Sequence, residues 1–213
     1  GTTYGAPSSE TEILIHTWSL SIEEQFYIFF PIIFYIIYKN FKNKILIFAI
    51  ILFSFSLFFS TLIAKNHPSF NFYMLSSRIF ELSFGGILAL IKLKKNSKLT
   101  KFSDYLVLLG TFLIFFSFFY FSKNTLHPSL LTLLPVIGSG IIIFFYSDKS
   151  VFKKLFTNRY LVYIGLISYS LYLWHWPILA ITKNIITIDD YLKFSLLIVV
   201  FVMSLLSYYL IEK

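Results

Sequence analysis

Long apolar runs separated by short polar connections dominate this chain of 213 residues. A membrane-spanning helix needs roughly 17 to 25 predominantly apolar residues. Seven stretches meet that length: residues 19–38, 45–64, 72–91, 105–121, 130–146, 160–181 and 191–210. Runs this long exceed the strands of a membrane barrel, so each is predicted to be a helix. The sequence therefore predicts an all-α, polytopic transmembrane bundle, forming a single domain over residues 1–213.

Basic residues in the connections predict the orientation of this bundle. Connections 39–44, 92–104 and 147–159 together carry twelve Lys or Arg residues, whereas 65–71, 122–129 and 182–190 carry three. Cytoplasmic loops are the basic ones, so we expect the N-terminus outside and the C-terminus in the cytoplasm. The net charge of +8 follows this topological pattern and does not indicate nucleic-acid binding.

Cysteine is absent, which excludes disulfides, zinc–thiolate sites and a cysteine acyl intermediate. No metal-ligand spacing appears either. The chain begins at Gly1 and its methionines are Met74 and Met203, so we expect a fragment without its native start.

The predicted orientation places the polar groups of the spans in the outer half of the bilayer. His16, Glu23, Glu24 and Gln25 lie at the outer end of the first span. Arg78 and Glu81 lie in the outer half of the third, and His175 lies near the outer end of the sixth. Placing an ionisable group inside a membrane costs free energy, so such a group usually indicates a functional site.

Glu23 and Glu24 have different explanations. Ser21 and Glu24 match a capping box, which would account for Glu24. Glu23 lies one helical turn from Ser19 and Tyr27, and a Ser–Glu–Tyr stripe is typical of a binding or proton-handling face.

Arg78 and Glu81 are three residues apart and so share a helix face. One interpretation is an internal ion pair; the other is that Arg78 orients an anionic group or pairs with Glu23. Gly85 and Gly86 follow and would let another helix approach closely.

The sixth span carries Gly165, Ser168, Tyr172 and His175 on one helical stripe. His175 is either an interfacial residue between belt tryptophans or part of a site, and we favour the site because histidine titrates near neutrality. Pro177 frees the carbonyl of Leu173. Elsewhere, Gly138-Ser139-Gly140 is predicted to be a packing notch.

Several strings resemble the membrane acyltransferase type 3 family. The run from His16 to Tyr27, His-Thr-Trp-Ser-Leu-Ser-Ile-Glu-Glu-Gln-Phe-Tyr, with Pro31, is similar to its signature. Residues 78–86 and 161–177 resemble its next landmarks, and 207–212 resembles its closing helix. These landmarks follow the family order and cover nearly the whole chain.

The resemblance implies a bundle of about ten spans that moves an acyl group, often acetyl, onto an exported sugar. It also implies cytoplasmic acyl-CoA as donor and no bound cofactor. The acceptor would be a hydroxyl of a lipopolysaccharide, exopolysaccharide, peptidoglycan or glycolipid. The location would be the bacterial inner membrane. An Arg and a His of the family's first helices have no counterpart here, and some members carry an SGNH-type domain after the bundle.

We therefore expect a membrane O-acyltransferase, with Glu23, Arg78 and His175 as catalytic candidates. The candidates for substrate binding are His16, Trp18, Ser19, Gln25, Tyr27, Glu81, Ser168 and Tyr172. The alternative is a transporter or flippase for a lipid-linked sugar or small anion, because interior charges also line translocation paths.

Overall fold

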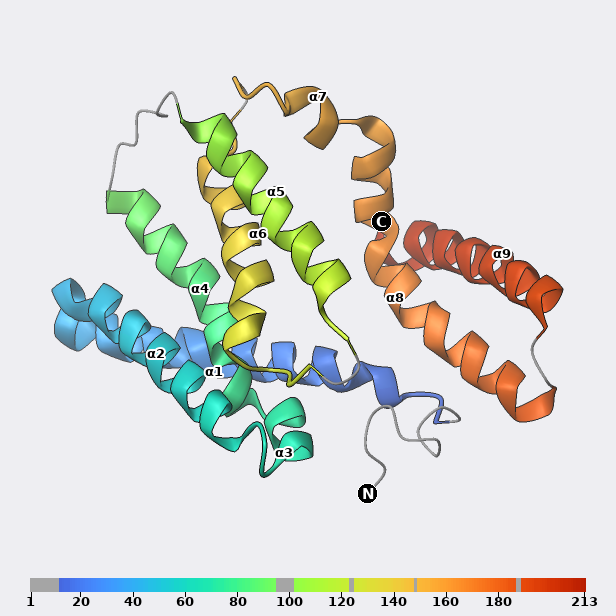
Figure 1. The fold of residues 1–213 in the computed structure, drawn as a ribbon, viewed down its shortest axis with the longest axis horizontal. Coiled ribbons are helices and arrows are strands. Elements are labelled where there is room, and N and C mark those ends of the chain that lie inside the picture. Colours follow the sequence, from blue (N-terminus) through green and yellow to red (C-terminus); the bar gives the residue numbers. More distant parts are fainter. Residues whose placement is uncertain (1–11, 95–101, 123–124, 148, 187–188) are drawn as a thin grey trace. The chain divides into compact units, whose positions relative to one another are not determined.

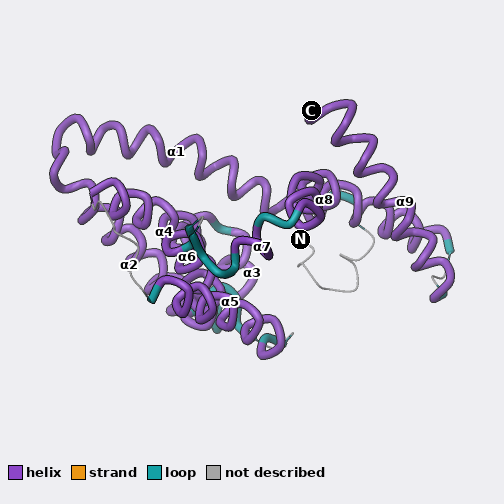
Figure 2. The backbone as a smooth tube through the Cα atoms, turned by 90° about the horizontal axis from the view of Figure 1, so that it is seen from above, coloured by secondary structure: helices purple, strands orange, loops and turns teal. Residues whose placement is uncertain are grey.

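The computed structural model describes residues 12–94, 102–122, 125–147, 149–186 and 189–213. Over these ranges the chain is helical and contains no β-strand (Figures 1 and 2). The long helices are α1 (Trp18–Phe41), α2 (Ile45–Ile63), α4 (Leu75–Lys94), α5 (Ser103–Tyr120), α6 (Leu133–Phe145), α8 (Arg159–Ile185) and α9 (Asp190–Ser207). Each of them overlaps one of the seven predicted stretches, so the all-helical prediction is confirmed.

Short helical segments join the long ones. They are the 3-10 turns η2 (Ile15–Thr17), η3 (Lys42–Lys44) and η4 (Leu130–Thr132), the helices α3 (Pro68–Tyr73) and α7 (Lys153–Phe156), and the closing π-helical turn η5 (Tyr208–Glu212).

Five segments of the described chain are long and apolar enough to cross a membrane: Ile15–Ile63, Pro68–Lys92, Ser103–Tyr120, Arg159–Ile185 and Asp190–Glu212. The first of them contains both α1 and α2. Helix α6 has 13 residues and is about 20 Å long, against the ~30 Å of a bilayer's hydrocarbon core. The protein is thus a multi-pass membrane protein, while the count of seven spans and the orientation stay predictions.

The described residues group into two compact units. The large unit, Leu20–Lys153, holds most of α1 and all of α2 to α6. The small unit consists of residues 12–19 and 154–213, with η2, the first residues of α1, α8, α9 and η5. Phe80 and Val107 are fully buried in the large unit and Ile167 in the small one.

Two helix pairs organise the large unit, because α2 packs against α4 and α5 packs against α6. Helices α4 and α6 run in the same direction and α5 runs opposite to them (Figure 1). A Cβ atom added at Gly138 would lie 2.7 Å from the carbonyl oxygen of Gly110, and one at Gly110 would lie 2.6 Å from that of Gly138. Only glycine permits this approach, so Gly138 is a packing notch as predicted.

The predicted helix over residues 72–91 is broken in the structure. Helix α3 ends at Tyr73, and Met74 is extended, with φ −94° and ψ 135°. Helix α4 then begins at Leu75. A break inside a membrane segment is tolerated only where the freed backbone groups find new partners. Side chains of α4 supply them, as described below.

Side-chain caps start the two long helices of the small unit, α8 and α9, which pack against each other. The Asn158 side chain accepts a hydrogen bond of 2.9 Å from the Tyr160 amide, and Asp189 accepts one of 2.8 Å from the Leu192 amide. Pro177 lies inside α8, which continues to Ile185.

Candidate functional site

The small unit gathers four of the predicted site residues into one cluster. His16 comes from η2, Ser19 from the first turn of α1, and Tyr172 and His175 from α8. The ring centroids of His16 lie 5.3 Å from Tyr172 and 5.5 Å from His175. Those of Tyr172 and His175 are 5.7 Å apart, because residues three apart share a helix face.

Hydroxyl groups form a directed chain through this cluster. The Tyr172 hydroxyl donates to the backbone carbonyl of His16. The Ser19 and Tyr172 hydroxyl oxygens are 2.7 Å apart. Because a phenol has one proton and Tyr172 uses it on the carbonyl, Ser19 is the donor of this second bond. The chain of hydroxyl groups links η2 and the first turn of α1, within the small unit, to α8.

The backbone of α8 fixes the tautomer of His175. Its Nδ1 lies 2.6 Å from the carbonyl oxygen of Tyr172 and 3.2 Å from that of Leu171. A carbonyl only accepts, so Nδ1 carries the proton, and Nε2 of the neutral ring has its lone pair available. Such a ring accepts a proton at Nε2 while Nδ1 stays anchored.

His16 is 4% exposed, and neither of its ring nitrogens makes a hydrogen bond to a described residue. Buried polar atoms usually have partners, and exceptions gather at functional sites. The segment preceding His16 is attached to α8, since Trp176 Nε1 donates to the Glu12 carbonyl at 2.8 Å.

Two other predicted residues of the small unit lie differently. Trp18 is half-buried at the first position of α1. Ser168 is exposed, and its hydroxyl donates to the Gly165 carbonyl of its own helix at 2.7 Å. A hydroxyl bound in this way is satisfied without a ligand. Sequence reasoning also missed Ser170, which is fully buried and donates to the Glu212 carboxylate.

Glu23, Gln25 and Tyr27 lie on the exposed surface of α1. The Glu23 carboxylate has no partner among the residues that the structure describes. The predicted capping box at Ser21 is wrong, because the turn η2 leads into α1 at Trp18 and places Ser21 inside the helix. The Ser21 hydroxyl instead accepts from Gln25 Nε2 at 3.4 Å.

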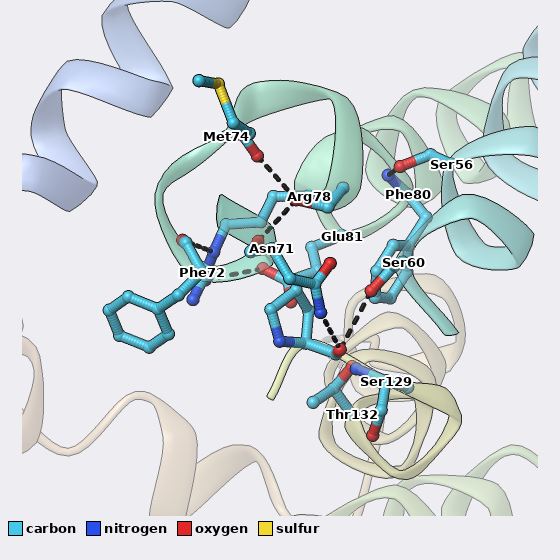
Figure 3. A network of polar contacts seen from close by, with 12 residues as sticks. Ser56, Ser60, Asn71, Phe72, Met74, Arg78, Phe80, Glu81, Ser129 and Thr132 are labelled. Atoms are coloured by element: carbon cyan, nitrogen blue, oxygen red, sulfur yellow. Dashed lines mark hydrogen bonds and ion pairs between the residues drawn. The ribbon is translucent and has the colours of Figure 1, made fainter. Parts of the chain in front are cut away.

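Arg78 and Glu81 form the internal ion pair that was one of the two predictions, with 3.3 Å between Arg78 Nη1 and Glu81 Oε2 (Figure 3). Arg78 Nε also donates to the Phe72 carbonyl at 2.9 Å. The Ser77 hydroxyl shares its single proton between the carbonyls of Asn71 and Met74, at 2.5 and 2.9 Å. These bonds satisfy the carbonyls that the break at Met74 frees, and the structure thus supports the internal ion pair.

A second part of this network fixes the connection between α5 and α6 (Figure 3). The Pro128 carbonyl accepts from Ser60 Oγ at 2.9 Å and from Asn71 Nδ2 at 2.8 Å. Both donors are buried. Sequence reasoning missed them, although the signal was present as small polar residues inside apolar runs.

His127 precedes this carbonyl, and its partly exposed ring lies edge-on to Phe72, with 6.1 Å between centroids. Loss of solvation lowers the pKa of His127 to about 4, and the positive charge of Arg78 acts in the same direction. The imidazole is therefore neutral at pH 7.

Comparison with known proteins identifies what the chain is similar to. A profile described as an acyltransferase domain, that of acyltransferase 3, matches residues 2–213. A candidate O-acetyltransferase of Staphylococcus aureus (strain COL) is 30% identical over 214 residues, covering 93% of this chain and 35% of that protein. Peptidoglycan O-acetyltransferase OatA of Listeria monocytogenes is 30% identical over 199 residues, covering 88% of this chain and 31% of that protein.

O-acetyltransferase OatA of Staphylococcus aureus (strain NCTC 8325) is 30% identical over 184 residues, covering 81% of this chain and 30% of that protein. The chain thus spans about a third of the length of these curated relatives. No solved structure matches it.

Proposed function

The chain belongs to the acyltransferase 3 family, and from this membership we propose that it takes part in moving an acyl group, acetyl in the first instance, to a hydroxyl of a cell-surface polymer. The Listeria relative is named a peptidoglycan O-acetyltransferase, which supports a cell-wall glycan as the acceptor. The proposed donor is acyl-CoA.

We place the protein in the bacterial inner membrane, with the basic connections in the cytoplasm. The cluster of His16, Ser19, Tyr172 and His175 then lies toward the outer face, where an exported acceptor arrives. The uneven distribution of Lys and Arg supports this orientation. Three of the connections carry twelve basic residues in total, whereas the other three carry only three.

The orientation is testable because the chain has no cysteine of its own. In intact cells, a membrane-impermeant maleimide should label Asn66→Cys. It should label Lys42→Cys only after the cells are permeabilised. The reverse pattern would contradict the proposed orientation.

His175 is the base of the proposed reaction. As the acceptor oxygen bonds to the acyl carbon, its proton moves to His175 Nε2. The carbon–sulfur bond of the thioester then breaks, and the proton passes to the departing thiolate. The single observation that carries this role is the 2.6 Å contact between His175 Nδ1 and the Tyr172 carbonyl, which leaves Nε2 as the acceptor.

The neighbouring groups hold this base and the acceptor in place. Tyr172 and Ser19 fix η2 and the first turn of α1 against α8, and His16 offers further ring nitrogens to a sugar hydroxyl. Glu23 remains a candidate for tuning a histidine outside this chain. Arg78 and Glu81 stabilise the fold of the large unit. Arg78 donates a hydrogen bond across the break at Met74, and Glu81 pairs with Arg78.

The test replaces His175 by Gln in the full-length protein and measures ester-linked acetate released from the cell wall by mild base. Loss of a general base should lower the acetate by about 100-fold or more. His67→Gln is the matched control, because His67 is exposed in the large unit, and it should keep the wild-type level. Unchanged acetate from His175→Gln at normal abundance would exclude His175 as the base.

A further inference from the structure

A cavity of about 380 Å³ lies between α4 and α6 in the large unit. Its volume falls within the range of roughly 300 to 1,000 Å³ that is usual for ligand sites. Most of its walls are apolar, with Phe84 and Leu88 on α4 and Val136 and Ile143 on α6 among the lining residues. Of the predicted site residues only Glu81 lines this space, and the proposed reaction does not use it.

Two glycines in its walls have opposite roles. A Cβ atom at Gly140 would lie 2.3 Å from the Phe84 ring, so Gly140 lets α6 rest directly on α4. A Cβ atom at Gly85 would meet no heavy atom within 4 Å. Gly85 therefore marks a recess in the wall, where a ligand can lie against the backbone of α4.

The two ends of the cavity differ in charge. Glu81 lies at one end and is neutralised by its ion pair with Arg78. Lys92 lies at the other end, exposed, two residues before α4 ends. The end of a membrane helix is where the hydrocarbon meets water, so Lys92 is placed to meet an anionic headgroup.

The length of the cavity fits one leaflet of a bilayer. Eleven residues separate Glu81 from Lys92, which corresponds to about 16 Å along a helix. Half of the ~30 Å hydrocarbon core is about 15 Å. A hydrocarbon chain whose headgroup lies at Lys92 therefore reaches the neutralised Glu81 end at the middle of the bilayer.

We propose that this cavity is a lipid site, which holds one acyl chain of an anionic phospholipid with the phosphate at Lys92. The apolar walls select a hydrocarbon chain, and the recess at Gly85 provides its width. One lysine near the membrane surface corresponds to about a fivefold preference for an anionic headgroup over a zwitterionic one.

The test uses the full-length protein in lipid nanodiscs with a photoreactive diazirine on one acyl chain. The probes are phosphatidylglycerol and phosphatidylcholine carrying the same chain. After illumination, labelled peptides are identified by mass spectrometry. We expect labelling of α4 and α6 at the cavity, stronger with phosphatidylglycerol by about fivefold, and loss of that preference in Lys92→Gln.

Gly85→Leu should lower labelling of the cavity peptides to that of the α5 surface, because the new side chain fills the recess. Gly165→Leu is the matched control, since a Cβ atom there also meets nothing within 4 Å, and Gly165 belongs to α8, which contributes no residue to the lining of the cavity. Circular dichroism and size-exclusion chromatography verify that both variants fold.

Three results would overturn the proposal. They are undiminished labelling in a folded Gly85→Leu variant, equal labelling by the two probes, and labelling of the cavity peptides no stronger than that of the α5 surface in the wild-type protein. None of these results depends on acyl transfer. The proposal of a lipid site and the proposed function can therefore be refuted independently of each other.

Discussion

The Pro128 carbonyl offers a sharp test of how the broken α3–α4 segment is stabilised. It accepts one hydrogen bond from Ser60 in α2 and one from Asn71 in α3. The test is a double-mutant cycle, in which Ser60→Ala and Asn71→Ala are made singly and together. Each single variant leaves the buried oxygen with one donor, whereas the double variant leaves it with none among the described residues.

The two cases should differ in free energy of unfolding. Loss of one hydrogen bond costs about 0.5–1.5 kcal/mol, and double-mutant cycles within membranes average about 0.6 kcal/mol. A buried carbonyl without any partner costs about 1–3 kcal/mol. The double variant should therefore be destabilised by about 1 kcal/mol more than the sum of the two single variants.

The assay is unfolding of the purified full-length protein by dodecyl sulfate in mixed micelles, followed by circular dichroism. Ser60→Ala with Ser139→Ala is the control pair, because Ser139 donates to Val136 of its own helix and shares no acceptor with Ser60. That pair should be additive within about 0.5 kcal/mol. Equal additivity of the Ser60 and Asn71 pair would refute the shared-acceptor argument.

Three further predictions concern packing, pH and the hydroxyl chain. Gly138→Ala should lower the free energy of unfolding by about 1–3 kcal/mol in the same assay, because the new Cβ atom would clash with the Gly110 carbonyl. An unaltered free energy of unfolding would contradict the close packing at Gly138. His127 binds protons more weakly when folded, so stability should rise with pH between about 4 and 6.5, and His127→Gln should remove this slope. Tyr172→Phe should lower released acetate about tenfold, and wild-type acetate would argue against a positioning role.

Apolar composition and run length predicted the helical segments. An apolar run must satisfy its backbone internally in lipid, which leaves the helix as its regular structure. From the loop charges the sequence predicted only that His16 and His175 lie at the same side of the membrane; the contact of Ser19 with Tyr172 was not predicted. Their chemical roles stay predictions.

Features that depend on tertiary contacts were not predicted. The extended backbone at Met74 is stabilised by Ser77 and Arg78 across the break, and an apolar run gives no sign of where it occurs. The capping box at Ser21 was wrong because the preceding 3-10 turn starts the helix earlier. The donors to Pro128 lie 57 and 68 residues away along the chain, beyond the reach of local patterns.

Sided acyl transfer in proteoliposomes tests the proposed function most directly. The full-length protein is reconstituted with isotopically labelled acetyl-CoA on the side of the basic connections and a soluble peptidoglycan fragment on the other. We predict ester-linked labelled acetyl on the fragment, lost with His175→Gln and retained with His67→Gln. Unmodified fragment crossing the membrane, with no labelled ester formed, would contradict acyl transfer and favour a transporter.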